Sequence, residues 1–156
     1  MTTAKGKQRA AVRDRSDDPL IEAVAQIGDR WSLLVVDALL PGPRRFGELL
    51  EQVEGLAPNI LSRRLRQLEA DGLVIAEPYS RKPLRHTYRL TAPGEELGGV
   101  LRMLSQWAAA RRGARAGAGS TGLAHQVCGT TLEAQWYCPT CDEVVGGEDA
   151  SDLHWL

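Results

Sequence analysis

The chain has 156 residues, of which 43% are hydrophobic and 25% charged, a composition typical of one compact globular domain with a small appendage. No run of about 20 apolar residues could cross a membrane, and the polar start lacks the apolar centre of a signal peptide, so we expect a cytoplasmic protein. Proteins that bind nucleic acid usually carry an excess of basic residues, so the formal net charge of -1 would argue against such a partner. This value, however, averages two parts of the chain that differ in charge.

The two ends of the chain differ strongly in charge. All 19 Lys and Arg precede residue 116, together with 14 of the 20 acids, so this part has a net charge of +5 and the last 41 residues, with six acids, have −6. Charge asymmetry of this kind indicates two parts with different partners. We predict a flexible basic arm (1–16), a domain that binds DNA (17–112), a linker of small residues (113–122) and a C-terminal module (123–156).

Residues 18–53 show the periodicity of three short helices. Asp18 followed by Pro19 is typical of a helix start, and Asp29 is the expected start of a second helix that Pro41 ends. A third helix follows, and apolar residues at intervals of three and four mark one face of each helix. The apolar stripe consists of Leu20, Val24 and Ile27 in the first helix and of Trp31, Leu34, Val35 and Ala38 in the second. In the third helix, Phe46, Leu49, Leu50 and Val53 have the spacing of a buried face.

A fourth helix is expected over residues 58–71, with Leu61, Leu65 and Leu68 on its inward face. Together with the third helix and a glycine-containing turn it forms the helix-turn-helix pattern, whose second helix lies in the major groove of DNA. By itself this pattern also fits an ordinary helical hairpin. The side chains predicted to contact base edges or flanking phosphates are Asn59, Ser62, Arg63 and Arg66, and Arg64 is predicted to hold a phosphate.

A basic β-hairpin is expected directly after this helix. Residues 73–79 are rich in β-forming side chains, residues 84–90 alternate between apolar and polar side chains, and residues 80–85 form the expected tip. The order of helices and hairpin is that of the winged helix-turn-helix, in which the hairpin lies across phosphates and binding weakens as salt rises. The predicted phosphate contacts are Arg81, Lys82 and Arg85; alternatively, these charges only solvate the hairpin.

The last predicted helix runs from Thr91 to Arg112 and has a long apolar seam. At 1.5 Å per residue it is roughly 30 Å long, which exceeds what the domain core needs. We therefore expect a homodimer through this helix, because two recognition helices about 34 Å apart match a palindromic operator. Packing on its own domain alone remains the alternative. The seam consists of Leu97, Val100, Leu101, Leu104, Trp107 and Ala108.

These motifs resemble the HxlR family of bacterial winged-helix regulators. The resemblance is carried by IGDRWSLLVV (27–36), GPRRFGEL (42–49), NILSRRLRQLEADGLV (59–74) and YRLT (88–91), and it covers about residues 18–112. It implies a homodimer that binds operator DNA, usually as a repressor, and that dimerises through the first and last helices. Many members have a cysteine before the proline of the first helix, which in some senses electrophiles or oxidants. Here Asp18 stands in its place, so the resemblance implies that any signal enters elsewhere.

All three cysteines lie in the C-terminal module. His125-Gln-Val-Cys128 and Cys138-Pro-Thr-Cys141 have the spacing of two metal-binding turns, separated by a strand-like stretch over residues 130–137. The pattern predicts a zinc ribbon with one zinc per chain, held by His125, Cys128, Cys138 and Cys141. Four protein ligands fill a tetrahedral site, so the zinc is expected to be structural, although its thiolates could also respond to oxidants.

Three alternatives remain open for the cysteine segment. Cys138 and Cys141 could form a redox pair, the segment could be an unstructured tail with incidental cysteines, or His154 could replace one ligand. Asp142 also stands where such turns usually have glycine.

The sequence thus predicts a mainly α protein with a small β-hairpin wing (α+β), a winged helix-turn-helix followed by a C-terminal zinc ribbon. The predicted function is sequence-specific binding of double-stranded DNA in transcriptional regulation. The first alternative is an adaptor whose acidic ribbon binds a protein partner. The second is a zinc hydrolase, against which the closed metal site and the lack of a general base argue, so we expect no enzyme.

Overall fold

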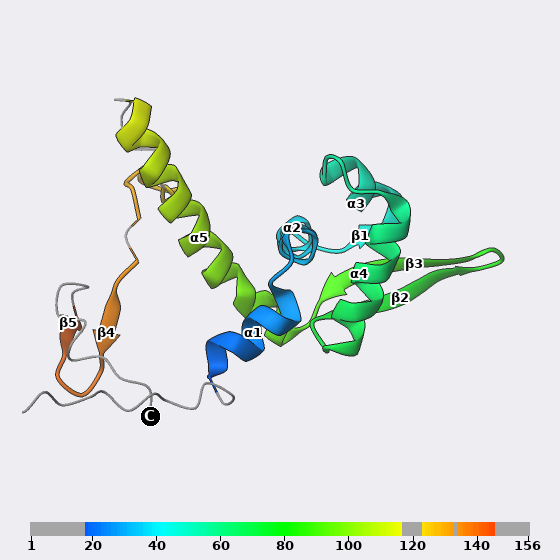
Figure 1. Cartoon of the computed structure of the whole chain (residues 1–156), viewed down its shortest axis with the longest axis horizontal. Helices are drawn as coiled ribbons and strands as arrows, with labels where there is room; N and C mark the ends of the chain where they lie inside the picture. The colour runs from blue at the N-terminus through cyan, green and yellow to red at the C-terminus, as the bar shows by residue number, and fades with distance from the viewer. Residues whose placement is uncertain (1–17, 117–122, 133, 146–156) are drawn as a thin grey trace, which may run out of the picture. The chain divides into compact units, whose positions relative to one another are not determined.

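The computed structural model describes residues 18–116, 123–132 and 134–145 (Figure 1). The chain divides into two compact units, Met1–Leu97 and Gly98–Leu156, and each is described by itself. The predicted arm over residues 1–16 lies outside the described residues. The elements in chain order are α1 (Pro19–Ile27), α2 (Arg30–Leu39), β1 (Arg44–Arg45), α3 (Phe46–Gln52), α4 (Pro58–Ala70), β2 (Val74–Arg81), β3 (Leu84–Leu90), α5 (Ala92–Ala116), β4 (Trp136–Cys138) and β5 (Glu143–Val145).

Aspartates cap the first two helices, as the sequence predicts. Asp18 Oδ1 accepts a hydrogen bond from the Leu20 N–H at 3.0 Å. Asp29 Oδ1 accepts from the N–H of Trp31 at 3.0 Å and of Ser32 at 3.2 Å, so two of the free donors at the start of α2 are satisfied. Gly28 separates the helices so tightly that a Cβ there would lie 2.2 Å from the Val24 carbonyl oxygen.

The core of the N-terminal unit lies between α2, α3, α4 and the base of the β2–β3 hairpin. Leu61, Leu65 and Leu68 of α4 are buried, which confirms the predicted inward face of that helix. The apolar face predicted for α2 is only partly buried: Val35 and Ala38 are buried, but Leu34 is 44% exposed, because Ser32 and Val36 take inward positions. A polar side chain can be buried there because the Ser32 hydroxyl donates a hydrogen bond to the Asp29 carboxylate.

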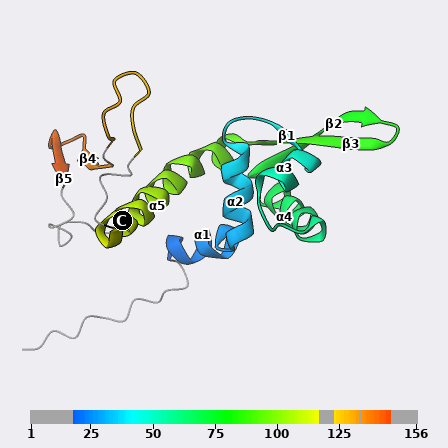
Figure 2. The same ribbon diagram turned by 90° about the horizontal axis from the view of Figure 1, so that it is seen from above.

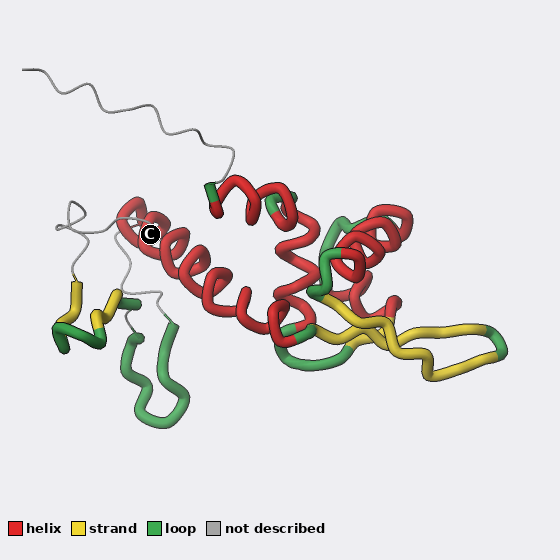
Figure 3. The backbone as a smooth tube through the Cα atoms, turned by 90° about the horizontal axis from the view of Figure 1, so that it is seen from below, coloured by secondary structure: helices red, strands yellow, loops and turns green. Residues whose placement is uncertain are grey.

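A three-stranded antiparallel sheet with the order β1-β3-β2 completes this unit. β2 pairs with β3 from Val74↔Leu90 out to Arg81↔Leu84, and the register shifts between Pro78 and Ser80. β3 has the bounds that the sequence predicts, β2 continues two residues past its predicted end at residue 79, and only two residues lie between the strands (Figure 3). Figure 2 shows this hairpin extending past α3 and α4. The sequence did not predict strand β1, because two residues are too few to show an alternating pattern.

The first turn of α5 is fastened to the end of the helix-turn-helix. The Thr91 hydroxyl accepts a hydrogen bond from the Gly94 N–H at 3.2 Å and donates one to the Gly72 carbonyl oxygen at 2.6 Å, as expected of the predicted N-cap. Gly94 has no room for a side chain, since a Cβ would lie 2.2 Å from the Leu73 carbonyl oxygen. These contacts define where the long helix leaves the N-terminal unit.

Helix α5 continues to Ala116, beyond the predicted end at Arg112 and into the predicted linker. Alanine and arginine, which favour helix, supply three of the four additional residues and outweigh the small-residue signal there. Residues 117–122 lie outside the described part of the chain. None of the helices that the structure describes is long and apolar enough to cross a membrane.

The C-terminal unit adds a small hairpin to α5. Strand β4 pairs with β5 in an antiparallel register from Trp136↔Val145 to Cys138↔Glu143. An isolated bridge joins Ala124 and Thr131, so the strand-like stretch predicted over residues 130–137 is only partly a strand. Gln106 of α5 donates a hydrogen bond from Nε2 to the Leu132 carbonyl oxygen at 2.9 Å, which holds this segment on the helix.

Candidate nucleic-acid interface

The exposed face of α4 carries three of the five side chains of this helix that are predicted to contact DNA. Asn59, Arg63 and Arg66 are exposed, and with Gln67 they line a groove of about 430 Å³. Gln67 was missed in the sequence, although its position four residues after Arg63 places it on the same face. This face therefore presents cations and amides, the side chains that read base edges and hold phosphates.

Two of the predicted contacts are engaged within the helix itself. Ser62 is half-buried, and its hydroxyl donates a hydrogen bond to the Pro58 carbonyl oxygen at 2.9 Å. The Ser62 carbonyl oxygen in turn accepts a hydrogen bond from Arg66 Nε at 3.2 Å. This bond lays the Arg66 side chain along the helix toward its start. The Ser62 hydroxyl has a local partner already and is the weaker candidate for contact with a base.

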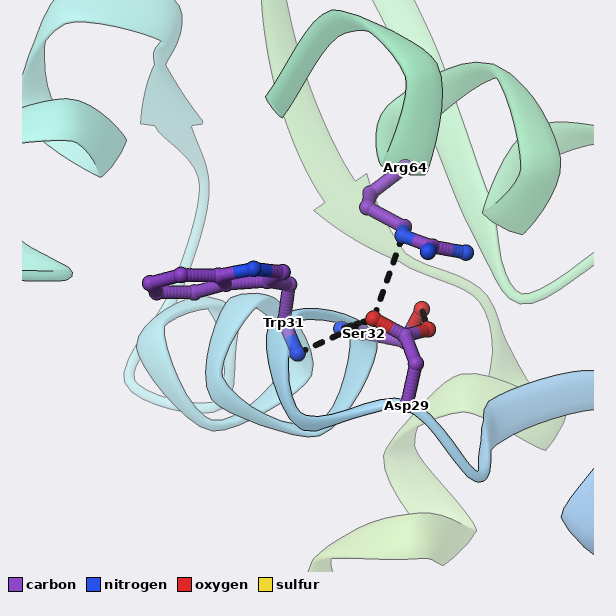
Figure 4. Close-up of polar contacts among 4 residues, drawn as sticks. All are labelled: Asp29, Trp31, Ser32 and Arg64. Carbon is purple, nitrogen blue, oxygen red and sulfur yellow. Dashed lines mark hydrogen bonds and ion pairs between the residues drawn. The ribbon is translucent and has the colours of Figure 1, made fainter. Parts of the chain in front are cut away.

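Arg64 lies beside this face and turns toward α2 (Figure 4). Its Nε is 3.1 Å from Oδ1 of Asp29, and the two side chains are 24% and 28% exposed. The N–H of Arg64 does not point at the oxygen, so the contact is an ion pair without a hydrogen bond. The phosphate contact predicted for Arg64 is therefore not its contact in the free protein. No sequence signal identified Asp29 as its partner, since a cap residue and a cation 35 positions apart need not meet.

The environment of Asp29 favours its charged form. Partial burial is the largest single influence and raises the pKa of the carboxyl group, whereas the hydrogen bonds from the Ser32 hydroxyl and N–H lower it. The Arg64 charge and the Trp31 N–H add to this effect, so the pKa lies below its ordinary value of 3.8. Asp29 is thus an anion at neutral pH and holds Arg64 by charge.

Positive charge gathers at the outer end of the β2–β3 hairpin. Arg81, Lys82 and Arg85 are all exposed, and the pairs Arg81↔Leu84 and Ser80↔Arg85 place them within one short segment of the two strands. Nearer the base, Arg89 forms an ion pair with Glu77, with Nε 2.6 Å from Oε1. Cations without an ion-pair partner among the described residues therefore concentrate where the sequence predicts the tip of the wing.

A second groove, of about 590 Å³, is lined by residues of α3 and of the β2–β3 hairpin. Arg45, which also lines it, stacks its guanidinium over the Tyr79 ring, 4.6 Å from the ring centre. Tyr79 lies where the register of β2 shifts. Arg45 is exposed and adds a cation beside the hairpin that sequence reasoning missed, although the pair Arg44-Arg45 before Phe46 was a visible basic signal.

Apolar side chains remain exposed on the two helices to which the family resemblance assigns dimerisation. On α1, Leu20 is 61% exposed, and Ile21 and Val24 are also exposed. On α5, Trp107 is 63% exposed, although Arg111 lies over its ring. Of the rest of the predicted seam on α5, Val100 and Leu104 are exposed, Leu97 and Ala108 are half-buried, and Leu101 is buried.

The predicted zinc ligands lie on two turns of matching geometry, residues 125–129 and residues 138–142, which we call the cysteine turns. In the first, the Gly129 N–H donates to the His125 carbonyl oxygen at 2.8 Å; in the second, the Asp142 N–H donates to the Cys138 carbonyl oxygen at 2.9 Å. The closing residue has a positive φ in both turns, 71° at Gly129 and 58° at Asp142. Asp142 thus adopts the left-handed conformation for which glycine is usual.

The pKa values of the three thiols differ with their hydrogen bonds. The Thr130 hydroxyl and N–H, followed by His125, lower the pKa of Cys128 to about 7. The N–H groups of Cys141 and Thr140 lower the pKa of Cys138, and Cys138 raises that of Cys141. Thiolates and imidazole are donors that suit zinc, so the chemistry of these four side chains fits the predicted metal.

The structure brings the predicted ligands together in pairs. His125 Nδ1 lies 3.3 Å from Cys128 Sγ, and Cys138 and Cys141 share a hydrogen bond. Among the residues that the structure describes, no three His, Cys, Asp or Glu side chains gather closely enough to hold a metal ion. His154 lies outside the described residues. The two pairs are formed in this structure, and the complete site of four ligands is not.

Two short helices joined by a turn, followed by a hairpin with a cationic tip, define a winged helix-turn-helix protein, a class that binds DNA. A family comparison narrows this class. The chain belongs to the HxlR-like helix-turn-helix family, whose pattern matches residues 26–115. The resemblance seen in the sequence is thereby confirmed.

Similar proteins support this assignment. The chain is 36% identical over 123 residues to an uncharacterised HTH-type transcriptional regulator of Mycobacterium tuberculosis H37Rv, a match that covers 79% of this chain and 77% of that protein. The reduced form of the transcriptional regulator YodB from Bacillus subtilis is 30% identical, with a TM-score of 0.52 over 58% of this chain and 89% of that one. The redox regulator HypR in its reduced form is 27% identical, with a TM-score of 0.58 over 64% and 99%. The chain is thus a transcriptional regulator of the helix-turn-helix type and not an enzyme.

Proposed function

We propose that this regulator binds a palindromic operator as a homodimer and represses transcription in the cytoplasm. The observation that carries the proposal is the exposed face of α4, with Asn59, Arg63 and Arg66, in the same unit as a hairpin whose tip holds three exposed cations. The helix face supplies side chains that discriminate bases, and the hairpin supplies phosphate contacts that position it.

The exposed apolar side chains of α1 and α5 support the dimer. Large apolar side chains cost free energy when they stay in water, and clusters of them typically mark protein interfaces. A twofold dimer would cover the same side chains on both copies and would duplicate α4, which suits an operator with two equal halves.

The test of DNA recognition is a selection from random duplexes with the full chain, followed by affinity measurements on the selected sequence. Arg63→Ala and Arg66→Ala should each weaken specific binding by about 1–3 kcal/mol, because each removes a cation from the helix face. Arg102→Ala, which removes an exposed arginine from α5, is the charge-matched control and should change affinity little.

Salt dependence provides a second measurement on the same complexes. Binding should fall steeply between 50 and 200 mM salt, by roughly 10³-fold or more for about six phosphate contacts. A double variant of Arg63 and Arg66 that binds the selected sequence as tightly as the parent would contradict the assignment. A parent chain that selects no sequence would favour an adaptor whose acidic C-terminal unit binds a protein.

We further propose that the C-terminal unit binds one zinc ion per chain through His125, Cys128, Cys138 and Cys141. The two matching cysteine turns support this proposal, since each presents two donors from its first and fourth residues. When bound, zinc would supply a cross-link between the turns, and so stabilise a unit that has little buried apolar surface among its described residues. The same thiolates would make the link sensitive to oxidants.

A further inference from the structure

One carboxylate joins the start of α2 to the side of α4. Oδ1 of Asp29 accepts the N–H groups of Trp31 and Ser32 and lies 3.1 Å from Arg64 Nε. Oδ2 accepts the hydroxyl hydrogen of Ser32. Both oxygens are thus engaged, and three of their partners belong to the rigid first turn of α2 (Figure 4). The carboxylate cannot follow Arg64 if α4 turns or slides.

Arg64 occupies a flanking position on α4. The neighbouring Leu65 points into the core, and Arg63 on the other side lies on the exposed face that lines the 430 Å³ groove. Successive residues on a helix point about 100° apart, so a small rotation of α4 would move Arg64 away from Asp29 and shift the exposed face with it. The rotation that allows the ion pair is therefore the rotation that presents Arg63.

We infer that Asp29 is a positioning residue for DNA recognition: it holds Arg64 against α2, sets the rotation of α4, and keeps the Arg64 guanidinium from binding DNA phosphates indiscriminately. This inference rests on the proposed function, because it concerns how the α4 face discriminates between sequences. It assigns to a helix cap a second role that the sequence alone does not reveal.

The substitution Asp29→Asn separates the two roles of the residue. Asparagine caps helices about as well as aspartate, so the start of α2 keeps its acceptor. The negative charge is lost, which frees Arg64 to reach a phosphate. Each additional phosphate contact steepens the dependence of log K on log salt concentration by about 0.9.

The experiment measures affinity for the selected operator and for random duplex DNA across a salt series. For Asp29→Asn we expect tighter binding to random DNA, a salt slope steeper by about 0.9 per added contact, and a specificity ratio lower by roughly tenfold. Asp37→Asn removes the same charge from an exposed position of the same helix and should match the parent chain. In the double variant Asp29→Asn/Arg64→Gln the steeper slope should disappear, because the added contact comes from Arg64.

Arg64→Gln tests the same pair without touching the cap. It should lower the specificity ratio while leaving the salt slope on random DNA at the parent value. The inference is overturned if Arg64→Gln keeps full specificity, or if Asp29→Asn folds and matches Asp37→Asn in both measurements. If the parent chain itself selects no operator, it is the proposed function that fails, and the two failures are thus distinguishable.

Discussion

Asp29, the N-cap of α2, accepts three hydrogen bonds from the first turn of its own helix and forms an ion pair with Arg64 of α4. The hydrogen bonds from Ser32 and the charge of Arg64 hold the pKa of the carboxyl group below 3.8 despite partial burial. The cap itself was predictable from the residue type and its place before a helix. The ion pair was not, because it depends on how α2 and α4 cross.

The lowered pKa of Asp29 predicts how stability depends on pH. Because folding favours the carboxylate, the stabilisation is fully present above the ordinary pKa near 3.8 and is lost as pH falls through the lowered folded value. Thermal unfolding of the parent and of Asp29→Asn should differ by about 1 kcal/mol or less at pH 7, as expected of a pair near the surface. The difference should shrink toward pH 2.5, and a difference that stays constant over this range would contradict the assignment.

At the scale of the secondary-structure elements, the two hairpins show which features a local sequence pattern predicts and which it does not. The β2–β3 hairpin was predicted from alternation and a basic turn, but β2 continues two residues past its predicted end because pairing with β3 extends into the polar tip. Strand β1 is stabilised only by its pairing with Tyr88 and Thr87. The cysteine turns follow from H-x-x-C and C-x-x-C spacing, and their matching hydrogen bonds emerged from the structure.

The cysteine turns predict that the purified full chain contains one zinc per chain. Cys138→Ser should lower the zinc content strongly and expose the C-terminal unit to proteases, because three ligands hold zinc less tightly than four. Thr140→Ser, which changes a residue between the two cysteines without removing a ligand, is the matched control. Elemental analysis, and the absorption spectrum after replacement by cobalt, would report the metal and its tetrahedral site. A folded chain with far less than one zinc would contradict the site.

At the scale of the whole molecule, the net charge of -1 is an average over two unlike parts. The part up to residue 115 carries +5 and the rest carries −6, so the cationic side chains of α4 and the hairpin belong to the positive part. Like charges repel through solvent over roughly a Debye length, about 8 Å at physiological salt. We therefore expect the acidic C-terminal part to oppose indiscriminate binding to DNA phosphates wherever it comes within that distance of the bound DNA.

Deletion of residues 116–156 should strengthen binding to random duplex DNA, most clearly at low salt where charges are least screened. A full-length variant with the six C-terminal acids replaced by amides separates charge from bulk and should show the same direction. Fluorescence anisotropy with labelled random DNA measures both. Equal or weaker affinity in both variants would count against electrostatic restraint. The six acids are Glu133, Asp142, Glu143, Glu148, Asp149 and Asp152.

Sequence by itself determined the order of the elements, the helix starts at Asp18 and Asp29, the inward leucines of α4 and the family. These features depend on local signals: cap residues, helical spacing and short motifs. Tertiary structure alone decided that Leu34 faces outward, that Arg45 stacks on Tyr79 and that Arg64 is bound to Asp29. These features depend on how helices and strands that are distant in the chain pack against one another. A local sequence pattern does not encode that packing.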